Sequence, residues 1–510
     1  MERRRLLAGA LSAAPLVSLA PLLGRGAAPS KGWGFIIVGA GTAGLPAAIF
    51  ASRRGAKVLL IDAADDIGGT MHMANGQVSA AGTRTQAAKG IVDTPDQHFE
   101  DALRLSMGLA DRNILRTTCD RAPETINWLL DNGLSPIADH PVTGSQPGRP
   151  AYTIPRYLWS AEEGPAILAV VRRQLEPELA SGRVVTQLNT RAGGLIQDAN
   201  GAIRGVRAKY RGESLEFFGR HILITSGGYS MNPELFERLN GFPAYSGGAY
   251  PHSQGDGLGL ATSVGGWLRG GELHRAGTGN ILTSDQFPAR VYGRFNTTPQ
   301  QRPPWEIWVN DHGERFIRED EPENYRRAMV LLKQPRLRYS VVFDQEILER
   351  APIGIPGWSM RRLVSHFNAH PMFHRADSLD ALAERAQINA AGLAATVKTY
   401  NASVPSGADD LGREHKPLPI RRGPFYAITH LGSSATSSAG IMVDNQMRVL
   451  RGDGKPIPNL YAAGEVLGSG ATLGNNFIPG FMLTPALTLG RLLGESLPIG
   501  ERHTRPGSQS

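Results

Sequence analysis

Near the start of the chain, the pattern of apolar residues changes from a continuous run to a helical period and then back to a continuous run. Phe35–Val38 and the run VLLI before Asp62 are apolar throughout, which is typical of strands that are buried on both faces of a parallel sheet. The segment between them, GLPAAIFASRRG, repeats its apolar residues with the period of a helix. Residues 33–62 are therefore predicted to form a β-α-β unit.

Two later apolar runs extend this prediction. HILITS ends at the pair Gly227-Gly228, and NLYAAG lies closer to the C-terminus. A helix is predicted from Thr484 to about Gly494, with Thr484 as its N-cap and Pro485 at its first helical position. Together these runs predict an α/β fold in which helices cover a parallel sheet.

The middle of the chain has a different pattern. It is turn-rich near RFNTTPQQRPP, continues with short strand-like runs such as EIWVN and YSVVFD, and then becomes helical near residues 379–400. We therefore predict an α+β cap domain of residues 272–430, inserted into an α/β domain made of residues 33–271 and 431–497, with a tail of residues 498–510. A substrate site is expected between the two domains, where ligand sites often lie.

Residues 1–28 have the layout of an export signal: a basic start, a weakly apolar stretch and small residues near Ala28. The pattern Arg3-Arg4-x-Leu-Leu resembles the twin-arginine type, which exports proteins already folded around a cofactor. The alternative is a membrane anchor, but Pro15 and Pro21 weaken a spanning helix. The protein is therefore expected to be exported, with a periplasmic location.

Composition narrows the class of protein further. With 510 residues the chain is long enough for two domains, and its 61 glycines indicate many tight turns and close backbone approaches to a ligand. The one cysteine, Cys119, excludes an intrachain disulfide, a cysteine-rich metal site and a CxxCH haem attachment, and no metal site is predicted. The net charge of +8 comes from scattered residues rather than a basic stripe, so no nucleic-acid partner is expected.

A glycine motif, Gly39-x-Gly41-x-x-Gly44, lies between the first predicted strand and the helix. The first glycine permits the tight turn, the second lets a pyrophosphate approach the backbone, and the third allows close helix packing. Asp62 ends the next strand, where a carboxylate can bind ribose hydroxyls. The alternative is an ordinary β-turn-α corner, but strand, helix and acid together favour a dinucleotide site.

The following loop, IGGTMHMANGQVSAAGT, is rich in glycine, serine and threonine. Here the chain resembles the fumarate reductase and 3-ketosteroid dehydrogenase superfamily of FAD flavoproteins. The motifs ILITSGGYSMNPEL, QGDGLGLATSVGG, WVNDHGERFIRE and IPNLYAAGEVLGSG occur in the family's order. The resemblance implies a Rossmann-like FAD-binding domain with an inserted cap. Thr70 stands where covalent members have a histidine, so it implies a non-covalent FAD, and His72 is expected to be a packing or flavin-edge residue.

The resemblance also implies the cofactor contacts. Glu465 would bind the ribitol or its surroundings, and Met482 and Leu483 would offer backbone amides to the flavin ring. For Asp256 the alternative is a turn residue, since Asp-Gly pairs are common in turns. The expected FAD-binding residues are Gly39, Gly41, Ala43, Gly44, Asp62, Gly69, Thr70, Gly76, Ala192, Gly228, Asp256, Glu465, Met482 and Leu483.

Arg315 and Tyr325 are the candidate catalytic residues. Arg315 matches an arginine of the family's G-x-R-F turn that donates a proton, although it could instead be a structural arginine paired with Glu319 or Asp320. The ketosteroid branch uses two tyrosines. Tyr325 lies two residues beyond the position of the first, while Asn476 stands at the second.

The expected substrate follows from departures from the fumarate pattern. Gly277, Ala435 and Phe477 fall at or near the positions of its carboxylate-binding residues. Without those partners a dicarboxylate would be poorly held, because buried unpaired charges are costly. We therefore expect a neutral ketone or enone whose C–C bond next to the carbonyl gains or loses hydrogen, with a separate electron carrier, quinone or oxygen. The alternatives are reduction of an unsaturated carboxylate, a flavin oxidase of alcohols or amines, and a non-catalytic electron carrier.

Overall fold

A computed structural model describes residues 32–499 apart from residues 147, 148 and 246. The predicted export signal, with Arg3 and Arg4, and all but the first two residues of the predicted tail lie outside the described residues. Within the described part, no helix combines the length and the apolarity needed to cross a bilayer.

The main sheet is built around the predicted β-α-β unit. Its strand order is β19-β20-β10-β1-β2-β7, and all neighbours are parallel except β19. The strands are β1 (Trp33–Val38), β2 (Val58–Ile61), β7 (Val184–Gln187), β10 (Glu213–Ile224), β19 (Arg448–Leu450) and β20 (Pro456–Ala462). The prediction of a parallel sheet is confirmed, because β10 and β20 contain the two later apolar runs.

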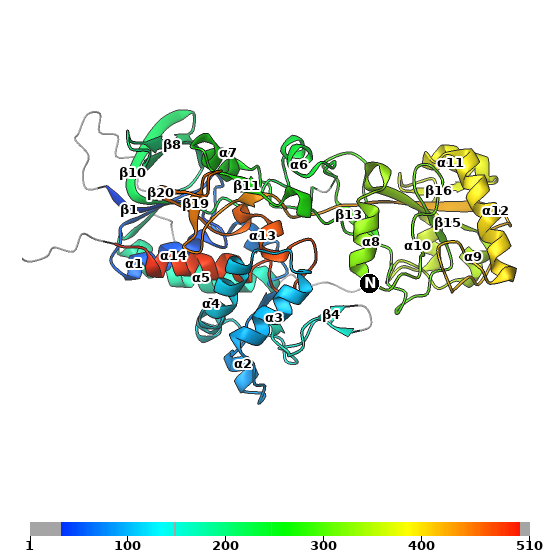
Figure 1. Ribbon diagram of the computed structural model, residues 1–510, viewed down its shortest axis with the longest axis horizontal. Coiled ribbons are helices and arrows are strands. Elements are labelled where there is room, and N and C mark those ends of the chain that lie inside the picture. Colours follow the sequence, from blue (N-terminus) through cyan, green and yellow to red (C-terminus); the bar gives the residue numbers. More distant parts are fainter. Residues whose placement is uncertain (1–31, 147–148, 246, 500–510) are drawn as a thin grey trace, which may run out of the picture.

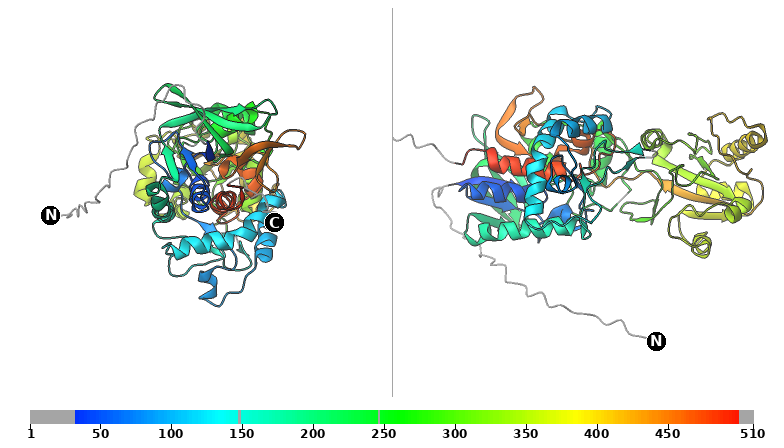
Figure 2. Two further views of the ribbon diagram at one scale, coloured as in Figure 1. Left: turned by 90° about the vertical axis from the view of Figure 1, so that its left-hand side faces the viewer. Right: turned by 90° about the horizontal axis from the view of Figure 1, so that it is seen from below.

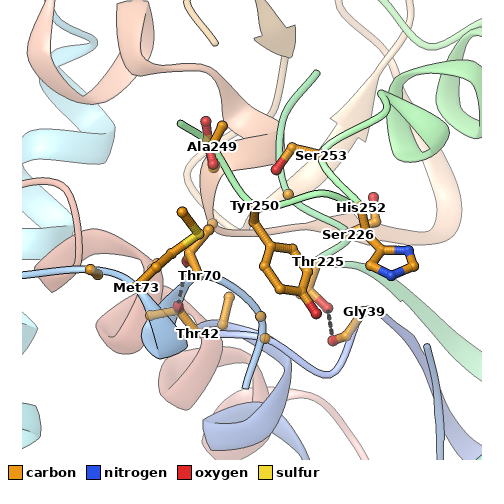
Figure 3. A pocket seen from close by; sticks show the side chains of 18 of the residues that line it. Gly39, Thr42, Thr70, Met73, Thr225, Ser226, Ala249, Tyr250, His252 and Ser253 are labelled. Carbon is orange, nitrogen blue, oxygen red and sulfur yellow. Dashed lines mark hydrogen bonds between the residues drawn. The ribbon is translucent and has the colours of Figure 1, made fainter. Parts of the chain in front are cut away.

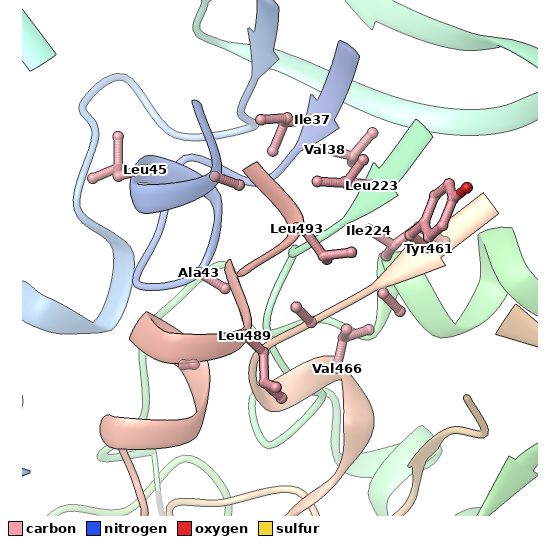
Figure 4. Packing of buried hydrophobic residues seen from close by; sticks show 14 of the residues in the cluster. Ile37, Val38, Ala43, Leu45, Leu223, Ile224, Tyr461, Val466, Leu489 and Leu493 are labelled. Atoms are coloured by element: carbon pink, nitrogen blue, oxygen red, sulfur yellow. The ribbon is translucent and has the colours of Figure 1, made fainter. Parts of the chain in front are cut away.

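Helices α1 (Gly44–Arg53) and α14 (Thr484–Ser496) lie side by side next to this sheet (Figure 4). Their contact depends on a glycine, because a Cβ at Gly490 would lie 2.0 Å from the Ala43 carbonyl oxygen. α4 (Arg112–Asp131) packs on α14, and α5 (Glu163–Ala180) packs on α1. The first and last parts of the chain therefore share one core.

The start of α14 differs from the prediction. Leu483 is the N-cap, and Thr484 is already the first helical residue. The Thr484 hydroxyl accepts a hydrogen bond from the Ser79 backbone amide at 2.9 Å, so a tertiary contact uses the oxygen that would have capped the helix.

The cap has a sheet of its own, with the order β14-β15-β17-β16 and every neighbour antiparallel. A second core of residues between Tyr245 and Leu431 surrounds it, whereas the predicted cap begins at residue 272. Figures 1 and 2 show an elongated molecule, with the main sheet at one end, the cap sheet and α12 at the other, and α8 between them. The domain boundaries stay predictions.

The other elements before the cap are short helices and strands, and β8–β9 form an antiparallel hairpin that continues onto β10. They are η1 (Gly69–His72), β3 (Val78–Ser79), α2 (Arg84–Ala87), α3 (Pro95–Leu105), β4 (Ser145–Gln146), β5 (Arg149–Pro150), β6 (Tyr157–Leu158), β8 (Thr190–Gln197), β9 (Ile203–Tyr210), α6 (Pro233–Asn240), α7 (Asp256–Ser263), β11 (Leu268–Arg269) and η2 (Gly271–Leu273).

The cap and the returning C-terminal part contain the rest. These are β12 (Asn280–Leu282), β13 (Val291–Arg294), β14 (Ile307–Val309), α8 (Asn324–Leu331), η3 (Pro335–Leu337), β15 (Arg338–Asp344), α9 (Gln345–Arg350), α10 (Met360–His366), β16 (Phe373–Ala376), α11 (Leu379–Ala386), α12 (Ala390–Ser406), β17 (Phe425–Leu431), β18 (Gly440–Ile441), η4 (Glu465–Leu467) and α13 (Ser469–Leu473).

Candidate active site

A cavity of about 400 Å³ opens where β1, β2 and β10 end and α14 begins (Figure 3). Its size lies in the range usual for ligand sites. The lining comes from the glycine turn after β1, the loop at η1, β8 and the ends of β2 and β10. The segment 248–256 and the C-terminal segments around Ala435, Glu465 and Leu483 complete it. Ligand sites of parallel sheets usually lie at this carboxyl edge of the strands.

Each glycine of the first turn has a different structural role. Gly39 has φ +115°, a conformation that side chains disfavour. A Cβ at Gly44 would lie 1.9 Å from the Gly39 carbonyl oxygen, so only glycine allows the helix to begin this close to the strand. At Gly41 the nearest atom to an added Cβ is 3.9 Å away, on Gly69. Gly41 and Gly69 therefore lie next to each other, and both leave bare backbone in the cavity lining.

Asp62 lies at the end of β2 and lines the cavity. Its carboxylate accepts hydrogen bonds from the backbone amides of Ala40 at 2.6 Å and Ala64 at 2.8 Å. Burial raises the pKa of Asp62, although these amides and His252 oppose the rise. The two bonds fix the carboxylate at the strand end, where ribose hydroxyls can reach it.

Glu465 lines the cavity from the C-terminal side. It accepts a hydrogen bond from the Ser437 amide at 3.1 Å, and burial raises its pKa. Gly228 lies behind it, because a Cβ there would come within 2.7 Å of the Glu465 Oε1 atom and 2.1 Å of the Ser437 hydroxyl. The glycine pair at the end of β10 therefore makes room for this glutamate.

Asp256 begins α7, and its carboxylate forms an ion pair with Arg191 at 2.5 Å. This pair ties α7 to β8, the strand that also contains Ala192. Both Asp256 and Ala192 line the cavity.

Most of the predicted cofactor residues meet at the cavity. The lining ones are Gly39, Gly41, Ala43, Asp62, Gly69, Thr70, Gly76, Ala192, Asp256, Glu465, Met482 and Leu483. Gly44 and Gly228 lie behind the lining, and His72 bonds to the Ile67 carbonyl oxygen at 2.9 Å instead. The Leu483 amide already donates to the Gly480 carbonyl oxygen at 3.3 Å, so an intraloop bond uses the amide that was expected to face the flavin.

The segment before Asp256 also belongs to the site, although it was not predicted from the sequence. Tyr250, His252 and Ser253 line the cavity, with the tyrosine and histidine rings close to Gly39 and Thr225 in Figure 3. Burial and the nearby Asp62 carboxylate raise the pKa of Tyr250. No motif marks these residues, because their place depends on how the loop folds back over the sheet.

The lining fits FAD. The N-terminus of α1 has no side-chain cap. The Leu45 amide donates to the Gly41 carbonyl oxygen at 3.1 Å and Pro46 has no amide hydrogen, so the amides before Leu45 are the ones that can meet a phosphate group. The Ser226 hydroxyl faces the cavity lining, is buried and has no hydrogen-bond partner among the described residues. Thr70, at the position where an attachment histidine would stand, lies 3.3 Å from the Thr42 hydroxyl. Bare backbone for a pyrophosphate, a carboxylate for ribose and spare hydroxyls are the groups that FAD needs.

Arg315 lies elsewhere, on the side of the cap that contains α12. Its guanidinium pairs with Glu319 at 2.7 Å and Asp409 at 2.7 Å and lies over the Tyr400 ring at 5.5 Å. Burial disfavours the charged form, but the two carboxylates outweigh this and raise the pKa of Arg315. It is not among the residues that line the cavity. This arrangement favours the structural alternative.

Tyr325 does not line the cavity either, but it contacts the segment that includes the lining residue Phe477. It is in the first turn of α8, and its hydroxyl accepts a hydrogen bond from the Asn475 side-chain amide at 3.3 Å. Asn475 is two residues from Phe477, which lines the cavity together with Ala435. Gly277 pairs through its backbone with Ser433, two residues before Ala435. Asn476, at the second tyrosine position, bonds to the Leu105 carbonyl oxygen at 2.8 Å.

Comparison with known proteins places these features in context. Residues 34–477 match the family described as FAD binding domain. A fumarate reductase (cytochrome) of Shewanella frigidimarina is 29% identical over 467 residues, which cover 90% of this chain and 76% of that protein. The 4-oxocyclohexanecarboxylate 2-dehydrogenase of Sinomonas cyclohexanicum is 25% identical over 565 aligned positions, which cover 92% of this chain and 93% of that protein.

A solved structure shows the same fold. The 3-ketosteroid delta1-dehydrogenase from Sterolibacterium denitrificans, in complex with 1,4-androstadiene-3,17-dione, has a TM-score of 0.67 and 19% identity, with 91% of this chain and 99% of that chain covered.

Proposed function

Because the chain belongs to the FAD binding domain family, we propose that it is an FAD-dependent oxidoreductase that adds or removes hydrogen across a C–C bond next to a carbonyl group. Its substrate is a neutral ketone or enone with an apolar, cyclic body. The relatives named above reduce or dehydrogenate C–C bonds, which supports this class of reaction.

The observation that carries the proposal is the part of the lining formed by Ala435 and Phe477, which are not among the residues proposed to hold FAD. Both side chains are apolar, and the described lining contains no arginine or lysine. Asn475, which contacts Tyr325, is two residues from Phe477. A dicarboxylate would meet no cation here, and burying its charges without partners costs several kcal/mol each, on the order of the penalty for a buried ion. A neutral carbonyl compound avoids this cost.

FAD, when bound, supplies a hydride acceptor or donor at N5. The residues proposed to hold it are the predicted contacts that line the cavity. The Tyr325 hydroxyl then donates a hydrogen bond to the substrate carbonyl oxygen. This bond stabilises the negative charge that develops there when the neighbouring carbon loses a proton or the β-carbon accepts hydride.

We also propose that FAD is bound without a covalent link and that the protein is exported by the twin-arginine route. Acid precipitation is expected to leave the flavin in the supernatant. Replacing Arg3 and Arg4 by lysine is expected to leave folded, FAD-loaded protein in the cytoplasm. Electrons would pass to or from a separate carrier, quinone or oxygen, since the sequence has no second glycine fingerprint for a nicotinamide cofactor.

Tyr325→Phe tests the proposed reaction. The oxidised holoprotein is mixed with cyclic ketones and the reduced holoprotein with the matching enones, and the flavin absorbance reports electron transfer. The variant is expected to keep FAD and fold but to lose turnover about 10²- to 10³-fold, the usual effect of removing a donor to a developing oxyanion. Wild-type turnover of fumarate but of no enone would contradict the proposal, and transfer to redox carriers alone would indicate an electron carrier.

A further inference from the structure

One contact joins the cap to the C-terminal part of the main domain beside the cavity. Tyr325 belongs to α8 of the cap, while Asn475 lies in the segment between α13 and α14. The Asn475 Nδ2 atom is 3.3 Å from the Tyr325 hydroxyl and 3.5 Å from the Met329 sulfur. Asn475 is only 9% exposed, so water does not compete freely for this bond.

The direction of the bond decides what the tyrosine can do. An amide nitrogen only donates, so it uses a lone pair of the phenol oxygen and leaves the phenol proton free. No described residue accepts a hydrogen bond from the Tyr325 hydroxyl. The proton is therefore available to an acceptor outside this contact.

The surroundings of Asn475 favour this orientation of its amide. The Met329 sulfur is a weak acceptor, which suits the nitrogen rather than the oxygen. The Asn475 Oδ1 atom is buried and has no partner among the described residues. With the amide reversed, the oxygen would take the phenol proton and compete with a substrate for it.

We propose that Asn475 is a positioning residue that makes Tyr325 a hydrogen-bond donor towards the substrate carbonyl. Its amide holds the phenol oxygen, directs the phenol proton away from itself and strengthens the phenol as a donor, because a hydrogen bond to the oxygen stabilises negative charge there. Since the two residues come from different domains, the donor is set up only when the cap and the C-terminal segment are in contact. This inference rests on the proposed role of Tyr325.

The test is a double-mutant cycle with the best ketone or enone probe. Asn475→Leu is expected to slow flavin reduction or reoxidation about tenfold in the wild-type background and not at all in the Tyr325→Phe background. Asn476→Leu, the same change at the next position, is the control and should leave the rate unchanged in both backgrounds. Equal losses for Asn475→Leu in both backgrounds would mean that Asn475 acts structurally and would overturn the inference alone. Full turnover of Tyr325→Phe would instead refute the proposed role of Tyr325 and with it the inference. Asn475→Ala serves as a second variant if leucine prevents folding.

Discussion

The side chain of Arg315 is 9% exposed, and its two carboxylate partners are almost completely buried. Without Arg315, Glu319 keeps the Arg413 guanidinium at 3.1 Å, whereas the buried Asp409 carboxylate loses its ion-pair partner. Arg315→Met is therefore expected to lower the free energy of unfolding by about 3 kcal/mol, measured by urea denaturation, while turnover of the folded enzyme changes little.

Arg318→Met is the matched control for this change. Arg318 pairs with Asp320 at 2.8 Å but is 30% exposed, and pairs in contact with water contribute less than about 1 kcal/mol. A variant at Arg315 that stays as stable as this control but loses turnover would restore its proposed role as the acid.

The positions of some single residues could be predicted from the sequence, and those of others could not. The residues fixed by local backbone geometry, such as Gly39 and Asp62, could be placed because the turn and the strand end are defined by neighbours in sequence. Tyr250 could not, because its position depends on a loop that folds back over distant strands. Of the two carboxylate partners of Arg315, Glu319 was named from the sequence as a structural alternative, whereas Asp409 could not be, since it is remote in sequence.

At the scale of elements, the contact between α1 and α14 depends on close approach. A methyl group at Gly490 would collide with the Ala43 carbonyl oxygen, and Ala43 lines the cavity. Gly490→Ala is therefore expected to force the helices apart, lower the melting temperature and reduce the FAD content of the purified protein.

Gly259→Ala provides the comparison within another helix. Gly259 lies in α7, and an added Cβ would have no atom within 4 Å. Alanine is a better helix former than glycine by roughly 0.5–1 kcal/mol, so this variant should be as stable as the wild type or more stable. Equal loss of FAD in Gly490→Ala and Gly259→Ala would show that the contact between α1 and α14 is not the cause.

Elements with strong periodicity were predicted well, and those defined by tertiary contacts were not. β1, α1 and β2 follow the apolar pattern closely. β7 was missed, because it is a short strand at the edge of the sheet and half of its residues are polar. The start of α14 was misplaced because Thr484 bonds to a residue far away in sequence.

Several histidines in the molecule have surroundings that disfavour the protonated, charged form of the side chain. Burial lowers the pKa of His274, His374 and His430 to about 4 in each case. In the unfolded chain histidine titrates near 6.5, so between about pH 6.5 and 4 the unfolded state binds more protons. Stability is therefore expected to fall as the pH drops through this window, by about 1.4 kcal/mol per unit for each of these residues.

His430→Phe is expected to lower the slope of that dependence by the contribution of one histidine, about 1.4 kcal/mol per pH unit. His430 is completely buried and stacks on the Tyr339 ring at 4.9 Å, so a phenyl ring can replace it. Urea denaturation of the holoprotein at a series of pH values gives the slope for both proteins. An identical slope would mean that His430 is able to take up a proton in the folded state.

The division of the main sheet domain into two distant stretches of sequence has a consequence for biosynthesis. Glu465, Met482, Leu483 and the helix that packs on α1 are translated only after the whole cap. A nascent chain that has completed β10 holds the glycine turn and Asp62 but lacks an entire wall of the cavity. The complete FAD cavity therefore forms only after the C-terminal part of the chain has been translated.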